Sequence, residues 1–153
     1  MGIESSRGPD SSRGPRAVAR LARQVELALG DVDLSLSQYR VLLHLDDVGP
    51  AAASALANRL DVTRPSVTAL IDGLAARGLV ERLPQPADRR RVQLVVTPAG
   101  AAALAAADAA VAARLDHIAE NLTEHGDADR AVAALDSWAD ALDAMRRAWL
   151  DGT

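Results

Sequence analysis

The chain has 153 residues, of which 49% are hydrophobic and 25% charged, as expected for a folded domain long enough to bury a core. Its formal net charge is −4, and it has no cysteine, which excludes disulfides, thiolate metal sites and cysteine redox sensing. We find no apolar run that predicts a membrane span or a signal peptide, so we expect a cytoplasmic protein with no membrane partner.

The N-terminal residues 1–15 predict a disordered tail that precedes a single domain at 16–153. The polar string Ser-Ser-Arg-Gly-Pro occurs twice in this tail, which is typical of chain that cannot form a core. Arginines in and beside the tail either contact DNA phosphates or are simply solvated: Arg7, Arg13 and Arg16.

Two helices are predicted next. Apolar side chains recur at three- and four-residue steps over 16–30, which indicates an amphipathic helix ending at Gly30. Ser35 or Ser37 caps a second helix that continues to about Asp47, and Gly49-Pro50 ends it.

The stretch that follows has the pattern of a helix-turn-helix. A short helix is predicted over 52–60, and Thr63 is a good N-cap for another that stops at Gly78. The tight turn between them is typical of a pair whose second helix can lie in the DNA major groove.

The start of that second helix carries the first candidate DNA contacts. Its polar and turn residues lie opposite an apolar face formed by Val67, Leu70, Ile71 and Leu74. Arg64 is expected either to neutralise a phosphate or to read a guanine, and Thr63 can cap the helix and contact phosphate together. The candidates are Thr63, Arg64, Pro65, Ser66 and Thr68.

A β-hairpin with an arginine-rich turn is predicted after this helix. Residues 79–83 and 92–96 have strand patterns, and Pro84 and Pro86 are expected to keep the loop between them out of the ladder. The like charges at the hairpin tip favour a DNA-contacting wing, in which Asp88 holds an arginine that enters the minor groove. The wing candidates are Asp88, Arg89, Arg90 and Arg91.

Two long helices complete the expected order, one from the Thr97 cap to about Leu122 and one from Asp127 or Asp129 to about Leu150. In the last helix the stripe Trp138, Leu142, Met145 and Trp149 predicts an interface or core. The fold class is therefore mainly α with a small β-hairpin wing, a winged helix-turn-helix at about 36–98.

The charge distribution agrees with DNA binding. Between Arg59 and Arg91 seven arginines accompany four acidic residues, a net +3, whereas 101–153 carries four arginines and ten acidic residues, a net −6. A basic segment beside an acidic one suits a protein that presents one face to phosphates. No nucleophile–base pair, phosphate loop or carboxylate pair indicates an enzyme, and the scattered His44, His117 and His125 predict neither a metal site nor a cofactor.

In order and spacing, these motifs resemble the MarR family of winged-helix transcription regulators. The resembling segments are Leu36-Ser37-Gln38-Tyr39, Leu56-Ala57, Val62 to Thr68, Arg77 to Arg82, Asp88-Arg89-Arg90, and Leu94, Val96, Thr97 and Gly100. The resemblance implies a homodimer with interlocking helices at about 16–30 and 98–150 that binds a palindromic operator and usually represses transcription. It also implies that Pro65, Ser66 and Thr68 face the groove and that Asp88 and Arg90 form the wing pair.

The resemblance further implies release from DNA by a small aromatic or anionic effector. Tyr39, Arg40 and His44 on the second helix are the candidate ligand residues. Arg40 is expected to receive an effector carboxylate or to pair with Asp33 or Asp47, and His44 lines the crevice or is a partly buried, satisfied histidine.

Three residues depart from the family pattern, and one of them is Ala52, which replaces the usual threonine cap of the third helix. Ala69 and Gly73 occupy positions of the fourth helix that many members fill with basic or amide residues, so base readout is expected to be thin. This motivates an alternative function, a ligand-binding or protein-interaction module on the same scaffold with weak or lost DNA readout.

Overall fold

A computed structural model describes residues 13–60, 62–85, 88–122 and 127–151. It contains six helices and one antiparallel hairpin in these ranges, and it separates into two compact units, one up to Ala112 and one from Ala113 onward. The predicted fold class, mainly α with a small hairpin, is confirmed.

The first unit begins with α1 (Arg13–Gly30) and α2 (Leu36–Val48). Helix α1 starts three residues earlier than expected, so Arg13, Gly14 and Pro15 belong to the helix and not to a tail; a proline is tolerated there because first-turn amides make no intrahelical bond. The rest of the proposed tail, residues 1–12, lies outside the described residues. Ser35, one of the two expected caps, forms a capping box with Gln38 at the start of α2.

The helix-turn-helix consists of α3 (Ala53–Leu60) and α4 (Arg64–Ala76). Thr63 caps α4 as predicted, and its Oγ1 accepts a hydrogen bond from Ser66 N. Gly78 ends the helix with a φ of +69°, while Leu79 N donates to Leu74 O and Gly78 N to Ala75 O. This pair of bonds is the Schellman motif, which requires the left-handed conformation that glycine adopts readily.

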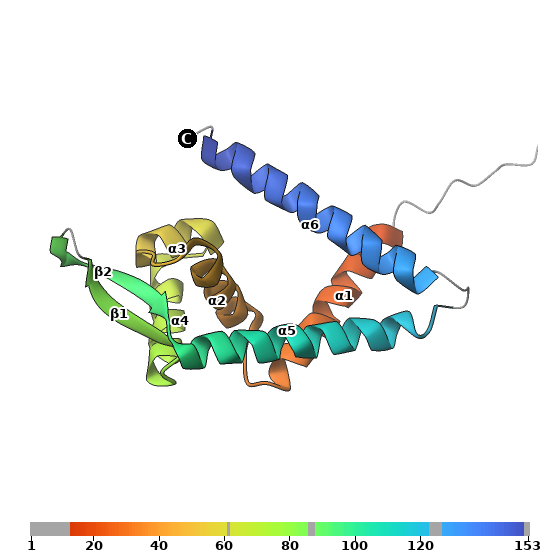
Figure 1. Cartoon of the computed structure of the whole chain (residues 1–153), viewed down its shortest axis with the longest axis horizontal. Coiled ribbons are helices and arrows are strands. Elements are labelled where there is room, and N and C mark those ends of the chain that lie inside the picture. Colours follow the sequence, from red (N-terminus) through yellow and green to blue (C-terminus); the bar gives the residue numbers. More distant parts are fainter. Residues whose placement is uncertain (1–12, 61, 86–87, 123–126, 152–153) are drawn as a thin grey trace, which may run out of the picture. The chain divides into compact units, whose positions relative to one another are not determined.

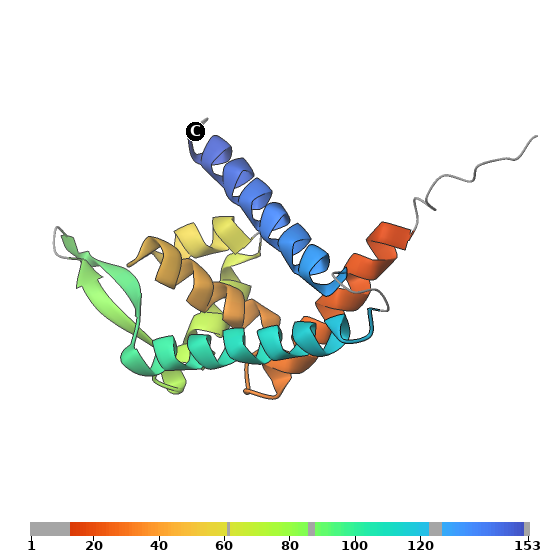
Figure 2. The ribbon, with the colours of Figure 1, turned by 45° about the vertical axis from the view of Figure 1, so that its right-hand side comes forward.

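The hairpin pairs β1 (Val80–Gln85) with β2 (Asp88–Val96) and projects away from α2, α3 and α4 in Figures 1 and 2. Both strands are longer than expected. The expectation that Pro84 would end the ladder is wrong, because Pro84 pairs with Val92 and the ladder continues to Gln85 opposite Asp88 after a register irregularity. In a two-stranded sheet both strands are edges, so a proline without a donor can face outward. Pro86 lies outside the described residues.

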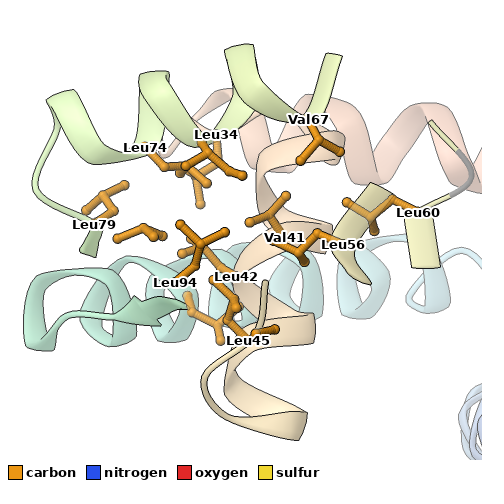
Figure 3. Close-up of a cluster of buried hydrophobic side chains, with 14 of the residues drawn as sticks. Leu34, Val41, Leu42, Leu45, Leu56, Leu60, Val67, Leu74, Leu79 and Leu94 are labelled. Atoms are coloured by element: carbon orange, nitrogen blue, oxygen red, sulfur yellow. The ribbon is translucent and has the colours of Figure 1, made fainter. Parts of the chain in front are cut away.

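One hydrophobic core joins these elements. It includes Leu42 and Val41 from α2, Leu56 from α3, Leu74 from α4 and Leu94 from β2, as Figure 3 shows. Ala51 and Leu94 exchange two backbone hydrogen bonds, at 3.1 and 2.8 Å, which tie the base of the hairpin to the segment before α3. The core therefore sets where α4 and the hairpin stand relative to each other.

Helix α5 (Pro98–Ala119) leaves the hairpin and places Leu104 and Ala107 in this core. By length and composition alone it could cross a membrane, which corrects the expectation that no run would qualify; a helix that covers a hydrophobic core passes the same test. In the second unit, α6 (Asp127–Asp151) follows, and the expected break at Gly126 lies outside the described residues.

Candidate nucleic-acid interface

Helix α4 divides cleanly into a buried and an exposed face. Val67, Ile71 and Leu74 are at most 1% exposed and pack into the core. All the proposed contact residues at its N-terminus are exposed: Thr63, Arg64, Pro65, Ser66 and Thr68. Because the burial of three apolar side chains fixes the rotation of the helix, this exposed face is held outward.

The hydroxyl groups at the start of α4 are engaged locally. Thr63 Oγ1 lies 2.8 Å from Ser66 Oγ, and Thr68 Oγ1 donates to Arg64 O at 3.0 Å. Among the described residues, Arg64 itself makes no side-chain hydrogen bond or ion pair. Its guanidinium is thus the donor group at this helix end that remains available to a ligand.

A salt bridge ties the hairpin to α4. Arg82 Nη2 in β1 lies 2.5 Å from Asp72 Oδ1 in α4, and both side chains remain about half exposed. This pair neutralises an acidic group that would otherwise stand alone on the exposed face. It links the hairpin to the helix that the core already positions, and within the described residues the Arg82 side chain makes no other hydrogen bond.

The arginine run was predicted at the hairpin tip, but Asp88–Arg91 are the first residues of β2: Asp88 pairs with Gln85, and Arg89, Arg90 and Arg91 fall at the register irregularity before Val92 pairs with Pro84. The ladder runs past Pro84, so these residues lie in the strand beside the connection and not within it. Their side chains lie outside the described part, and the expected pair between Asp88 and Arg90 remains a prediction.

The segment between α1 and α2 flanks the C-terminal half of α4. Arg77 Nη1 donates to Asp33 O at 2.5 Å, and the Gln38 Nε2 amide would lie 3.6 Å from a β-carbon at Gly73. Gly73 thus faces α2, so a long basic side chain there would first meet Gln38. The exposed face of α4 is flanked by β1 on one side and by the start of α2 on the other.

The three candidate ligand residues point to different surroundings. Tyr39 Oη donates to Asp108 Oδ1 on α5 at 2.6 Å, and burial, together with this bond and the charge of Asp108, raises the Tyr39 pKa well above its usual value of 10.0. Arg40 Nη2 lies 3.5 Å from Leu60 O. His44 lines an open hollow of about 800 Å³ formed with the start of α3 and the hairpin. These contacts do not place the three side chains together in one crevice.

Comparison with known proteins agrees with this geometry. A model of the MarR family matches residues 32–91, which span the helix-turn-helix and most of the hairpin. An uncharacterized HTH-type transcriptional regulator of Mycobacterium bovis is 37% identical over 116 residues, which cover 76% of this chain and 79% of the relative. The chain belongs to the MarR family. It is a winged helix-turn-helix transcriptional regulator.

Solved structures of MarR-family proteins have the same fold. The crystal structure of apo MarR from Escherichia coli superposes with a TM-score of 0.68 at 25% identity, covering 88% of this chain and 96% of MarR. The repressor CouR bound to a 23-mer DNA duplex superposes with a TM-score of 0.64 at 32% identity, covering 82% and 88%. CouR from Rhodococcus jostii RHA1 bound to p-coumaroyl-CoA also has a TM-score of 0.64, at 23% identity over 86% and 87% of the two chains.

Sequence reasoning did not single out three side chains that border the candidate interface: Arg82, Asp72 and Gln38. A signal for the first two was present, because an acidic residue on a helix face expected to meet phosphates requires a nearby cation. Gln38 entered the sequence analysis only within the segment Leu36-Ser37-Gln38-Tyr39 that resembles the family. Its position beside Gly73 depends on how α2 crosses α4, which no local pattern specifies.

Proposed function

We propose that this protein is a dimeric, sequence-specific repressor that binds a palindromic operator in double-stranded DNA. The observation that carries the proposal is the outward face of α4: a capped N-terminus, an exposed Arg64 whose side chain has no partner among the described residues, and a hairpin linked to the helix by Arg82 and Asp72. An exposed helix of this kind can enter a major groove about 12 Å wide, while the hairpin reaches the flanking backbone.

Each proposed contact has a distinct role. Arg64 contacts a phosphate or a guanine near the helix start, Pro65, Ser66 and Thr68 face the groove, and Thr63 pairs helix capping with a phosphate contact. In the hairpin, Arg90 enters the adjacent minor groove with Asp88 beside it, and Arg89 and Arg91 neutralise backbone phosphates.

Dimerisation is supported by the second unit and by the geometry of DNA. Three members of the α6 stripe are exposed, Trp138 and Met145 at 69% each and Leu142 at 60%. Large apolar side chains in such a row favour burial against a second copy. A two-fold dimer places two recognition helices about 34 Å apart, one turn of duplex, so that each half-site receives one helix.

A small aromatic or anionic effector is proposed to release the protein from DNA. Binding of p-coumaroyl-CoA by CouR shows that a protein of this fold takes an aromatic, anionic ligand. Of the three candidates, His44 borders a hollow, while Tyr39 and Arg40 lie elsewhere on α2. The protein is proposed to be cytoplasmic and not an enzyme, in keeping with relatives that are transcriptional regulators.

The test begins with duplexes selected from genomic DNA by the purified protein, including DNA upstream of its own gene. Binding is measured by gel shift, and the oligomeric state by light scattering. Arg64→Ala is expected to weaken binding by the dimer at least about 25-fold, because one DNA contact of about 1–3 kcal/mol is lost in each subunit. Arg23→Ala is the matched control, since Arg23 is an exposed arginine of α1 that pairs with Glu26.

Specific binding by a dimer, weakened at Arg64 and unchanged at Arg23, supports the proposal. A folded dimer that shifts no selected or promoter duplex at low salt contradicts it. That result would favour the ligand-binding or protein-interaction module that Ala69 and Gly73 suggest.

A further inference from the structure

The outermost ridge of α4 is built almost entirely from small and apolar groups. At about 100° per residue, the direction opposite Val67, Ile71 and Leu74 is occupied by Pro65, Ala69, Asp72 and Ala76. All four of these ridge residues are exposed. The one charged member, Asp72, is paired with Arg82.

The neighbouring hydroxyl group of Thr68 is not available as a donor. Thr68 Oγ1 donates to the Arg64 carbonyl in its own helix, at 3.0 Å, which uses its only hydrogen. The side chain therefore cannot donate to the O6 and N7 acceptors of guanine or the N7 of adenine. What Thr68 and Ala69 have left to offer a base edge is chiefly methyl groups.

Methyl groups have one specific counterpart in the major groove. Thymine carries a C5-methyl there, and contact with alanine, the threonine methyl or another apolar group recognises it. A ridge of small side chains also lets the helix backbone approach the base edges closely, so that such a contact can form.

We propose that Ala69, with Thr68 and Pro65 beside it, reads the C5-methyl of a thymine in each operator half-site. The inference rests on the proposed function and specifies its sequence preference. Hydrogen-bonded readout by this protein then falls to Arg64, Ser66 and the hairpin arginines, while the middle of α4 selects T·A pairs by apolar contact.

The test uses a selected operator in which thymines are replaced by deoxyuridine, one symmetric pair at a time, so that only the methyl is removed. Affinity is measured by fluorescence anisotropy. At one symmetric pair of thymines, the affinity of the wild type is expected to fall about fourfold per half-site, and so about 15-fold for the palindrome. This is the effect of removing one buried methyl group at each end of the operator.

Ala69→Gly and Ala69→Ser supply the second side of a double-mutant cycle. Ala69→Gly removes the methyl group of Ala69, and Ala69→Ser converts it into a polar hydroxymethyl group of similar size. Because the thymine and deoxyuridine duplexes are compared for the same variant, any loss of helix stability cancels. Each variant is expected to bind the thymine and deoxyuridine duplexes within about twofold of each other at the sensitive pair.

Two outcomes overturn the inference while leaving the proposed function standing: specific binding with no sensitive thymine, or a sensitive thymine whose effect persists in both Ala69 variants. Failure to bind any selected duplex is a different result, because it removes the proposed function itself.

Discussion

Gly73 and Gly100 are both helical glycines, and the same substitution is predicted to have opposite effects at the two. An ideal β-carbon at Gly100 would lie 2.0 Å from Leu79 O and 2.9 Å from Val96 Cγ1. An ordinary C···O contact is about 3.3 Å, so an alanine must push α5 away from the entry to β1 by about 1.3 Å. At Gly73 the nearest atom is Gln38 Nε2 at 3.6 Å, an ordinary contact.

The expected magnitudes follow from these distances. Gly100→Ala gains about 1 kcal/mol of helix propensity but overpacks the joint. It also disturbs Thr97 Oγ1, which donates to Gly78 O at 2.6 Å and accepts from Gly100 N at 3.0 Å. With about 1 kcal/mol for each hydrogen bond, we expect a net loss of about 2–4 kcal/mol in the free energy of unfolding. Gly73→Ala is expected to gain about 0.5–1 kcal/mol, because only the propensity changes.

Thermal unfolding followed by circular dichroism, at one fixed protein concentration, measures both effects. For a chain of this length the melting temperature should fall by about 5–15 °C for Gly100→Ala and rise by about 1–4 °C for Gly73→Ala. If Gly100→Ala were as stable as the wild type, the close approach of α5 to Leu79 would be wrong. If Gly73→Ala melted lower, the space beside Gln38 would be wrong.

Two further predictions concern charged and titrating groups. Arg82→Ala should change the free energy of unfolding by less than about 1 kcal/mol, because its ion pair with Asp72 is exposed. It should nevertheless weaken DNA binding about tenfold, because the Asp72 carboxylate is left unpaired. Adding Asp72→Ala should restore part of the affinity, and no recovery in an anisotropy titration would mean that Asp72 does not face DNA. Tyr39 is the only tyrosine, and its raised pKa means that its contribution to stability is complete below pH 10 and is lost as the pH rises further. Absorbance at the tyrosinate band should show ionisation above pH 10 in the folded protein and near pH 10 after denaturation. Equal ionisation midpoints in the folded and the denatured protein would contradict the hydrogen bond to Asp108.

Local chemistry made much of the fold predictable from the sequence. The Thr63 cap, the Gly78 stop and the apolar face of α4 each depend on residues within one or two turns, and the structure confirms all three. The hairpin was less predictable, because an edge strand tolerates a proline. The presence of Pro84 therefore does not reveal whether the pairing of β1 with β2 continues beyond it.

The site was predictable where it lies on one element and not where elements meet. Arg64, Ser66 and Thr68 were placed on the exposed face of α4 from periodicity alone. The engagement of the Thr68 hydroxyl by Arg64 O is a rotamer choice that no spacing reveals. The divergence of Tyr39 and His44 depends on the packing of α5 and the hairpin around α2, which arises only from the assembled core.

The most direct test of DNA binding through α4 and the hairpin is the salt dependence of the dissociation constant for a selected duplex. Each neutralised phosphate contributes about −0.9 to the slope of log K against log salt. If Arg90 or Arg64 contacts phosphate in both subunits, its change to alanine should weaken binding and make the slope less steep by about 2, whereas Arg23→Ala should leave both unchanged. Wild-type affinity and an unaltered slope in both the Arg64→Ala and the Arg90→Ala proteins would contradict the interface.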